Sequence, residues 1–180
     1  MPESLKVNDR KEDEQALEEL MKLTLNSALD NLAKSRSIEG ANLKKDISKR
    51  LATIEKLTVR IKAKENDVVL EYKQKLQLRL AELLEKTDFD ENRFNTEIAY
   101  FADKCNITEE LVRLSSHLKL FVSDLEKTIP SGRHFDFLVQ EINREFNTIG
   151  SKSADKEITN SVLLAKGELE KIREQIQNIE

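Results

Sequence analysis

Two glutamates that lie four residues apart are the side chains of this sequence best placed to do chemistry. Glu141 and Glu145 stand in the stretch FDFLVQEINREFNTIGSK. If this stretch is helical, a spacing of four places both carboxylates on one face, one turn apart. Such oxygen pairs suit Mg²⁺ or Mn²⁺, and a cation held there can polarise a phosphate and activate a water. The alternative is a salt-bridge network, since E-x-x-x-E pairs beside an arginine are common on helices.

Two further side chains extend this candidate site. Asp136 precedes the glutamates by about one helical turn and joins them as a candidate metal ligand. His117 lies beside the apolar stripe of another segment and supplies an imidazole for proton transfer. The candidate catalytic residues are therefore Glu141, Glu145, His117 and Asp136, and the candidate metal ligands are Glu141, Glu145 and Asp136.

Several basic side chains are candidates for binding phosphate. Arg36 and Arg50 are spaced by multiples of seven from Leu43 and Leu57, which places both arginines on an apolar face. Charges there are costly unless they are paired or hold a ligand. Intrahelical pairs, such as Arg50 with an aspartate four residues earlier, and a phosphate-binding cleft both fit this pattern. The full candidate set is Arg36, Arg50, Arg133, Arg144 and Lys152.

The composition bounds the class of protein. The 180 residues are 36% charged and 38% hydrophobic, with four Gly and two Pro, which is typical of long helices. The net charge of −4 excludes an argument for nucleic-acid binding from total charge alone. The single Cys105 excludes an internal disulfide and suits a reducing cytosol. No apolar run reaches the length of about 18 residues that a membrane span needs, so we expect no membrane partner.

The hydrophobic periodicity predicts an all-α fold, in which a long antiparallel helical hairpin projects from a compact multi-helix base. Residues 1–11 are linker-like, 12–90 form the hairpin with its tip near residues 63–67, and 91–180 form the base that carries the candidate active site. Helical patterns within the base cover about 91–104, 107–127, 134–149 and 155 to the C-terminus. The apolar seams of its second and last helices also predict exposed apolar surface.

The sequence resembles a known family over most of its length. The stretches GRHFDFLVQEINREFNTIGSK and EITNSVLLAKGELEKIREQIQNIE are similar to the C-terminal signature of the bacterial YicC/YloC endoribonucleases. The upstream stretches RSIEGANLKKDISKRL, EYKQKLQLRLAELL and EIAYFADKCNITEELVRLSSHLKLF resemble the segments that precede this signature. The resemblance begins at about residue 5, at the family's interdomain segment. We therefore expect the family's N-terminal domain to be absent.

The resemblance implies a metal-dependent endoribonuclease that hydrolyses phosphodiester bonds in RNA with Mn²⁺ or Mg²⁺. It also implies RNA as a partner, a homo-oligomer that is hexameric in the family, and a bacterial cytoplasmic location. The phosphate-binding candidates would then contact RNA. The absent domain puts the activity of this chain in question. The alternative is a non-catalytic helical module for oligomerisation or RNA binding, with its carboxylates held in salt bridges.

Overall fold

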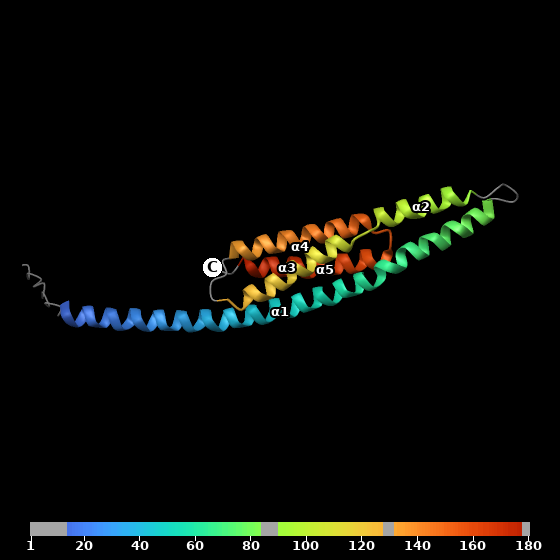
Figure 1. Cartoon of the computed structure of the whole chain (residues 1–180). Coiled ribbons are helices and arrows are strands. Elements are labelled where there is room, and N and C mark those ends of the chain that lie inside the picture. Colours follow the sequence, from blue (N-terminus) through green and yellow to red (C-terminus); the bar gives the residue numbers. More distant parts are fainter. Residues whose placement is uncertain (1–13, 84–89, 128–131, 178–180) are drawn as a thin grey trace, which may run out of the picture. The chain divides into compact units, whose positions relative to one another are not determined.

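The computed structural model describes residues 14–83, 90–127 and 132–177, and all regular structure among these residues is helical. This confirms the predicted all-α class. Five helices follow one another in the described parts of the chain (Figure 1), namely α1 (Glu14–Leu83), α2 (Glu91–Lys104), α3 (Thr108–Leu125), α4 (Gly132–Lys152) and α5 (Lys156–Ile176).

The turn predicted near residues 63–67 is wrong, because α1 continues through it as one helix of 70 residues. The polar run KEND contains no Gly or Pro, so nothing in its backbone ends a helix. Ile54, Ile61 and Val68 follow one another at steps of seven, and all three are buried. The apolar face therefore runs unbroken past the polar run, and its packing keeps this part of the chain helical.

Residues 84–89, which follow α1 in the sequence, lie outside the described part. α2 then runs back along the end of α1 (Figure 1), with Asp90 capping its first turn by accepting a hydrogen bond from the Arg93 amide at 3.0 Å. The Tyr72 ring of α1 stacks on the Phe101 ring of α2, with 3.6 Å between centroids. The antiparallel pair is thus formed by α1 and α2, and not by two halves of residues 12–86.

The described chain divides into two compact units within α1, between Asn42 and Leu43. In the first unit, all the side chains described from residue 15 to residue 42 are exposed. They include a series of large apolar residues at helical spacing: Leu17, Leu20, Met21, Leu25, Leu29 and Leu32. This part of α1 therefore gains no stability from buried side chains, although most of the stability of helices in proteins comes from such packing.

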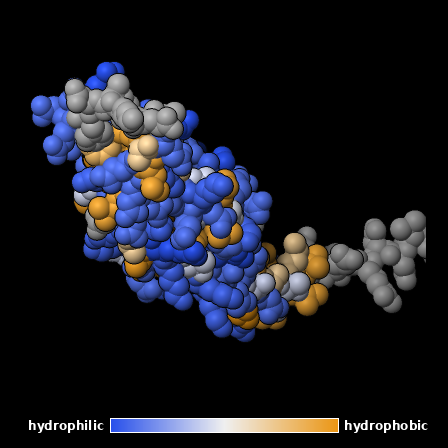
Figure 2. Space-filling model, turned by 90° about the vertical axis from the view of Figure 1, so that its right-hand side faces the viewer, coloured by the Kyte–Doolittle hydropathy of each residue, from blue (hydrophilic) through white to orange (hydrophobic). Residues whose placement is uncertain are grey.

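The second unit has one hydrophobic core, to which α1 from residue 43, α3, α4 and α5 all contribute. The rings of Phe121 and Phe135 meet in it at 4.9 Å between centroids. The α5 seam that was expected to leave apolar surface is instead buried here, as Val162, Leu169 and Ile172 are at most 4% exposed. The view in Figure 2 accordingly shows a largely hydrophilic surface with small, separate hydrophobic patches.

A membrane-spanning segment was not expected, and none of the helices in the described ranges has the length and apolar character to cross a bilayer.

The continuity of α1 can be tested at Ala63, an exposed residue in the segment that was expected to turn. Ala63→Pro should lower the free energy of unfolding by about 3 kcal/mol, because proline removes an intrahelical hydrogen bond and clashes with the carbonyl one turn earlier. Ala63→Ser is the matched control and should cost less than about 1 kcal/mol. Chemical denaturation measures both free energies of unfolding. A proline variant as stable as the serine variant would contradict a continuous α1 and support a turn near residues 63–67.

Candidate active site at the α3–α4 seam

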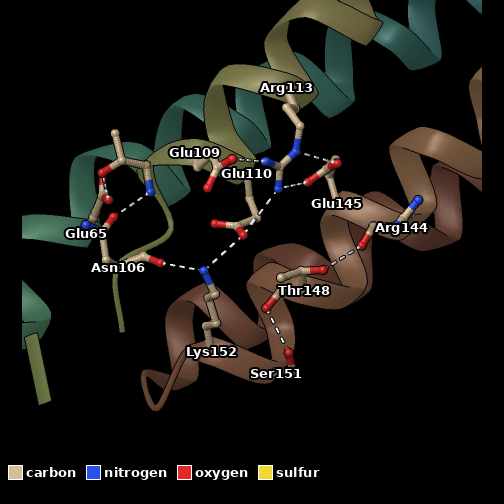
Figure 3. A network of polar contacts seen from close by, with 11 residues as sticks. Glu65, Asn106, Glu109, Glu110, Arg113, Arg144, Glu145, Thr148, Ser151 and Lys152 are labelled. Atoms are coloured by element: carbon tan, nitrogen blue, oxygen red, sulfur yellow. Dashed lines mark hydrogen bonds and ion pairs between the residues drawn. The ribbon is translucent and has the colours of Figure 1, made fainter. Parts of the chain in front are cut away.

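The candidate site lies along the seam between α3 and α4, where charged side chains are buried beside the hydrophobic core (Figure 3). Glu110 of α3 stands four residues before the buried Leu114. Glu145 of α4 stands three residues after the buried Ile142. Helical periodicity therefore turns both carboxylates toward the core. They are 3% and 4% exposed, so each must be compensated by a cation or a hydrogen bond.

Arg113 compensates the buried charge of Glu145 through a bidentate ion pair across the seam. Its Nε donates to Glu145 Oε1 at 2.8 Å, and its Nη2 donates to Oε2 at 3.1 Å. The same guanidinium contacts Glu109 at 2.6 Å and Glu110 at 3.3 Å. The hydrogen bond to Glu145 is the main cause of a raised pKa of Arg113. Both oxygens of Glu145 are therefore engaged, and the predicted role of this residue as a metal ligand would require Arg113 to withdraw.

Lys152, at the end of α4, makes the second cationic contact. Its Nζ donates to Glu110 Oε1 at 2.9 Å and to the Asn106 carbonyl at 3.0 Å. Burial raises the pKa of Glu110, but the hydrogen bond from Lys152 and the charge of Arg113 outweigh it and hold the pKa below its ordinary value. Glu110 Oε2 is buried without a hydrogen-bond partner in the described part of the chain. Lys152 thus ties the end of α4 to the segment that precedes α3.

These contacts fix the register of two antiparallel helices. Arg113 is paired with Glu145, and nearer the other end His134 Nε2 lies 2.6 Å from Asp124 Oδ2. One turn beyond Arg113 on α3 is His117, and one turn before Glu145 on α4 is Glu141, so this register places the two residues at the same level of the antiparallel pair. Both are half-buried. Within the described ranges, neither takes part in an ion pair or a side-chain hydrogen bond.

Asp136 is turned toward other partners. Its Oδ2 accepts a hydrogen bond from Gln140 at 2.7 Å, and its Oδ1 lies 3.6 Å from Arg173 of α5. The α4 helix therefore directs Asp136 toward α5 and Glu145 toward α3. No group of three or more His, Cys, Asp or Glu side chains suited to a metal ion occurs in the described ranges. As arranged here, the predicted ligands Glu141, Glu145 and Asp136 do not fit a shared cation.

The candidate phosphate-binding residues are not gathered into one patch. Arg50 donates to Asp46 at 2.8 Å and to Glu168 at 2.9 Å, so it joins α1 to α5, and its pKa is raised mainly by Asp46. Lys152 is committed to Glu110, as described above. Arg133 and Arg144 are exposed on α4, and Figure 3 shows Arg144 pointing away from the charged network. Arg36 is exposed in the other unit.

The sequence-based prediction missed Glu110 and Arg113, which organise this seam. A signal for Glu110 was present, because its spacing from Leu114 places a charge on the core-facing side of an otherwise apolar stripe. Arg113 follows Glu110 by three residues, a spacing at which opposite charges meet on a helix. The contact from Arg113 to Glu145 joins residues 32 positions apart, and no local pattern reveals such a pair.

The depressed pKa of Glu110 gives a test of this network by pH. A carboxyl whose folded-state pKa is lowered stabilises the fold above its unfolded pKa of about 4.3, and this contribution is lost as the pH falls through the folded value. Glu110→Gln should therefore cost about 1–3 kcal/mol at pH 7, by loss of charged hydrogen bonds, and progressively less below pH 4. Urea unfolding at several pH values measures this. A difference that grows on acidification would contradict the assignment.

Comparisons with known proteins agree with the family resemblance. Residues 61–180 match the family described as "Endoribonuclease YicC-like, C-terminal". Over 180 residues the chain is 46% identical to the probable endoribonuclease YicC of Clostridioides difficile (strain 630), and over 174 residues it is 32% identical to that of Haemophilus influenzae. These alignments cover 99% and 97% of this chain but only 61% and 60% of the two relatives. The chain therefore belongs to the YicC-like endoribonuclease family, through the family's C-terminal region.

Proposed function

We propose that this chain is the catalytic region of a metal-dependent endoribonuclease that hydrolyses phosphodiester bonds in RNA. Two relatives named probable endoribonuclease support the reaction class. The observation that carries the proposal is the position of His117 and Glu141, which are half-buried, in register across the seam, and not neutralised by an ion pair in the described part of the chain. An imidazole and a carboxyl group are side chains commonly used in general acid–base catalysis.

In the proposed reaction, one of these two groups takes a proton from the attacking water as its oxygen bonds to phosphorus. The other group gives a proton to the ribose oxygen that leaves. Imidazole and carboxyl side chains are among the groups that enzymes use most often for such proton transfers. Arg144, exposed one turn of α4 away from Glu141, is the nearest candidate on that helix to neutralise a phosphate.

We assign Glu145, Glu110, Arg113 and Lys152 a positioning role, because their charges are satisfied by one another. The divalent cation, Mn²⁺ or Mg²⁺, stays part of the proposal through the family. Since Glu141, Glu145 and Asp136 are not grouped around one point in the described part of the chain, no step is assigned to it. When bound, such a cation would polarise the phosphate.

The proposal extends to partners and location. RNA is the proposed substrate and the bacterial cytoplasm is the proposed location. We also propose a homo-oligomer, hexameric by family resemblance. The exposed leucines of residues 17–32 support self-association, since apolar stripes of this kind are usually covered by a partner.

A second function is favoured by a specific observation, namely the number of carboxylates that are capped by cations. Glu145 and Glu110 are capped by Arg113 and Lys152, and Asp136 lies near Arg173. A non-catalytic RNA-binding or oligomerisation module would carry its acidic residues in this state. Such a module would bind RNA and leave it uncut.

Cleavage assays on single variants separate these functions. Glu141→Gln and His117→Gln should each lower the cleavage rate by at least about 10²-fold, because each removes a proton-transfer group. Their melting temperatures should stay within about 2 °C of the parent, since neither residue is ion-paired. Glu19→Gln, an exposed glutamate in the other unit, is the matched control and should retain full activity.

The assay is run on RNA with Mn²⁺, with Mg²⁺ and with a chelator, which measures metal dependence independently of the site residues. Full activity in Glu141→Gln would exclude the proposed pair. RNA that is bound but never cut by the parent chain would favour the module.

A further inference from the structure

A pocket of about 400 Å³ lies between the second half of α1, α2 and the start of α5. Its walls include two aromatic rings, Tyr72 and Phe101, and three lysines, Lys64, Lys75 and Lys156. None of these residues belongs to the α3–α4 seam. The pocket falls in the range of about 300–1,000 Å³ that is typical of sites for small organic groups.

Two aromatic rings, stacked on each other, contribute to the lining of this pocket. Tyr72 and Phe101 stack with 3.6 Å between centroids and an angle of 7° between ring planes. Both side chains are half-buried, so the pair packs α1 against α2 while part of it still faces the pocket. A nucleobase of any sequence can extend such a stack on an outer ring face, because every base has a π-face.

The charges around the rings are divided between the interior and the rim. Lys64 is half-buried and lies 3.2 Å from Glu71, which also lies 3.8 Å from Lys75. Asp155 is committed to the first turn of α5, where its Oδ1 accepts from the Glu157 amide at 2.7 Å.

Glu157 lies 3.6 Å from Arg60, so each carboxylate around the pocket already has a partner. Lys156 is exposed and has no ion pair in the described ranges, and Lys75 is exposed with one long contact. Two cationic groups are thus available at the rim beside the stacked aromatic rings.

We propose that this pocket binds one unstacked nucleotide of single-stranded RNA. The base lies against the Tyr72–Phe101 pair, and Lys75 and Lys156 contact the flanking phosphates. Glu71 remains within the pocket as an acceptor for an amino group on the base edge. The inference rests on the proposed function only in taking RNA as the ligand class. It places strand binding apart from His117 and Glu141, so binding and cleavage can fail separately.

The experiment measures binding of a labelled single-stranded oligoribonucleotide by fluorescence anisotropy, using the whole chain. Tyr72→Leu keeps an apolar side chain against Phe101 but removes the aromatic face, and should weaken binding by at least about 5-fold. Tyr72→Phe is the matched control and should bind like the parent. Lys156→Gln should weaken binding and lower the slope of log affinity against log salt by about 1.

A second probe keeps the proposal testable if Tyr72→Leu fails to fold. Photo-crosslinking of an oligoribonucleotide with a photoreactive base should label the peptide that contains Tyr72 or Phe101 in the parent chain. An abasic ribose-phosphate chain of the same length should bind more weakly. Equal affinity of the abasic chain, or unchanged affinity in Tyr72→Leu, would overturn the nucleotide pocket.

The two proposals give separable outcomes. Binding that depends on Tyr72 without any cleavage sustains the pocket and contradicts the catalytic assignment. Cleavage that is unaffected by Tyr72→Leu, with crosslinks elsewhere, sustains the catalytic assignment and overturns the pocket. A parent chain that binds no RNA would overturn both.

Discussion

The rest of the second unit depends on the guanidinium of Arg113, held between Glu145 on α4 and Glu109 and Glu110 on its own helix. A buried carboxylate is tolerated only when a cation and good hydrogen-bond geometry compensate its desolvation. Because both oxygens of Glu145 are satisfied only at this point of α3, the two helices have one favourable register. That register places His117 and Glu141 at the same level of the pair and buries the apolar residues of both helices in one core.

This constraint gives different surroundings to Glu141 and Glu145, the two glutamates that the sequence suggested as a metal site. Glu145 lies on the core-facing side of α4 and is buried. The desolvation of its charge there is compensated only by a cationic partner such as Arg113. Glu141, one turn earlier, lies at the edge of the seam and is half-buried without an ion pair in the described part of the chain. The same spacing of four residues thus ties one carboxylate into the network of ion pairs and leaves the other outside it. This difference is the basis for proposing Glu141, and not Glu145, as a catalytic residue.

Local patterns in the sequence were sufficient for the helical class and for the helices after residue 90, but not for the continuity of α1 or for the contacts between helices. The stripes around Leu114, Ile142 and Val162 predicted core faces that the structure buries. The run KEND was misread because polarity was taken as a turn signal, although the apolar step from Ile61 to Val68 continued through it.

The site needed tertiary information. Glu145, Asp136 and Arg50 each have a cationic or acidic partner on another helix, which spacing could not identify. Spacing identified only the intrahelical pair of Arg50 with Asp46. The aromatic pocket is likewise lined by residues of α1, α2 and α5. No local pattern in the sequence indicates that these three segments meet.

The most direct measurement is a double-mutant cycle on the contact between Arg113 and Glu145, with Arg113→Met, Glu145→Gln and the double variant unfolded in urea. If Glu145 is a structural carboxylate bound by Arg113, the two substitutions should be coupled by about 1–3 kcal/mol, and either one alone should be clearly destabilising. A coupling near zero, with Glu145→Gln as stable as the parent, would contradict the account, because Glu145 would then not be the partner that sets the seam.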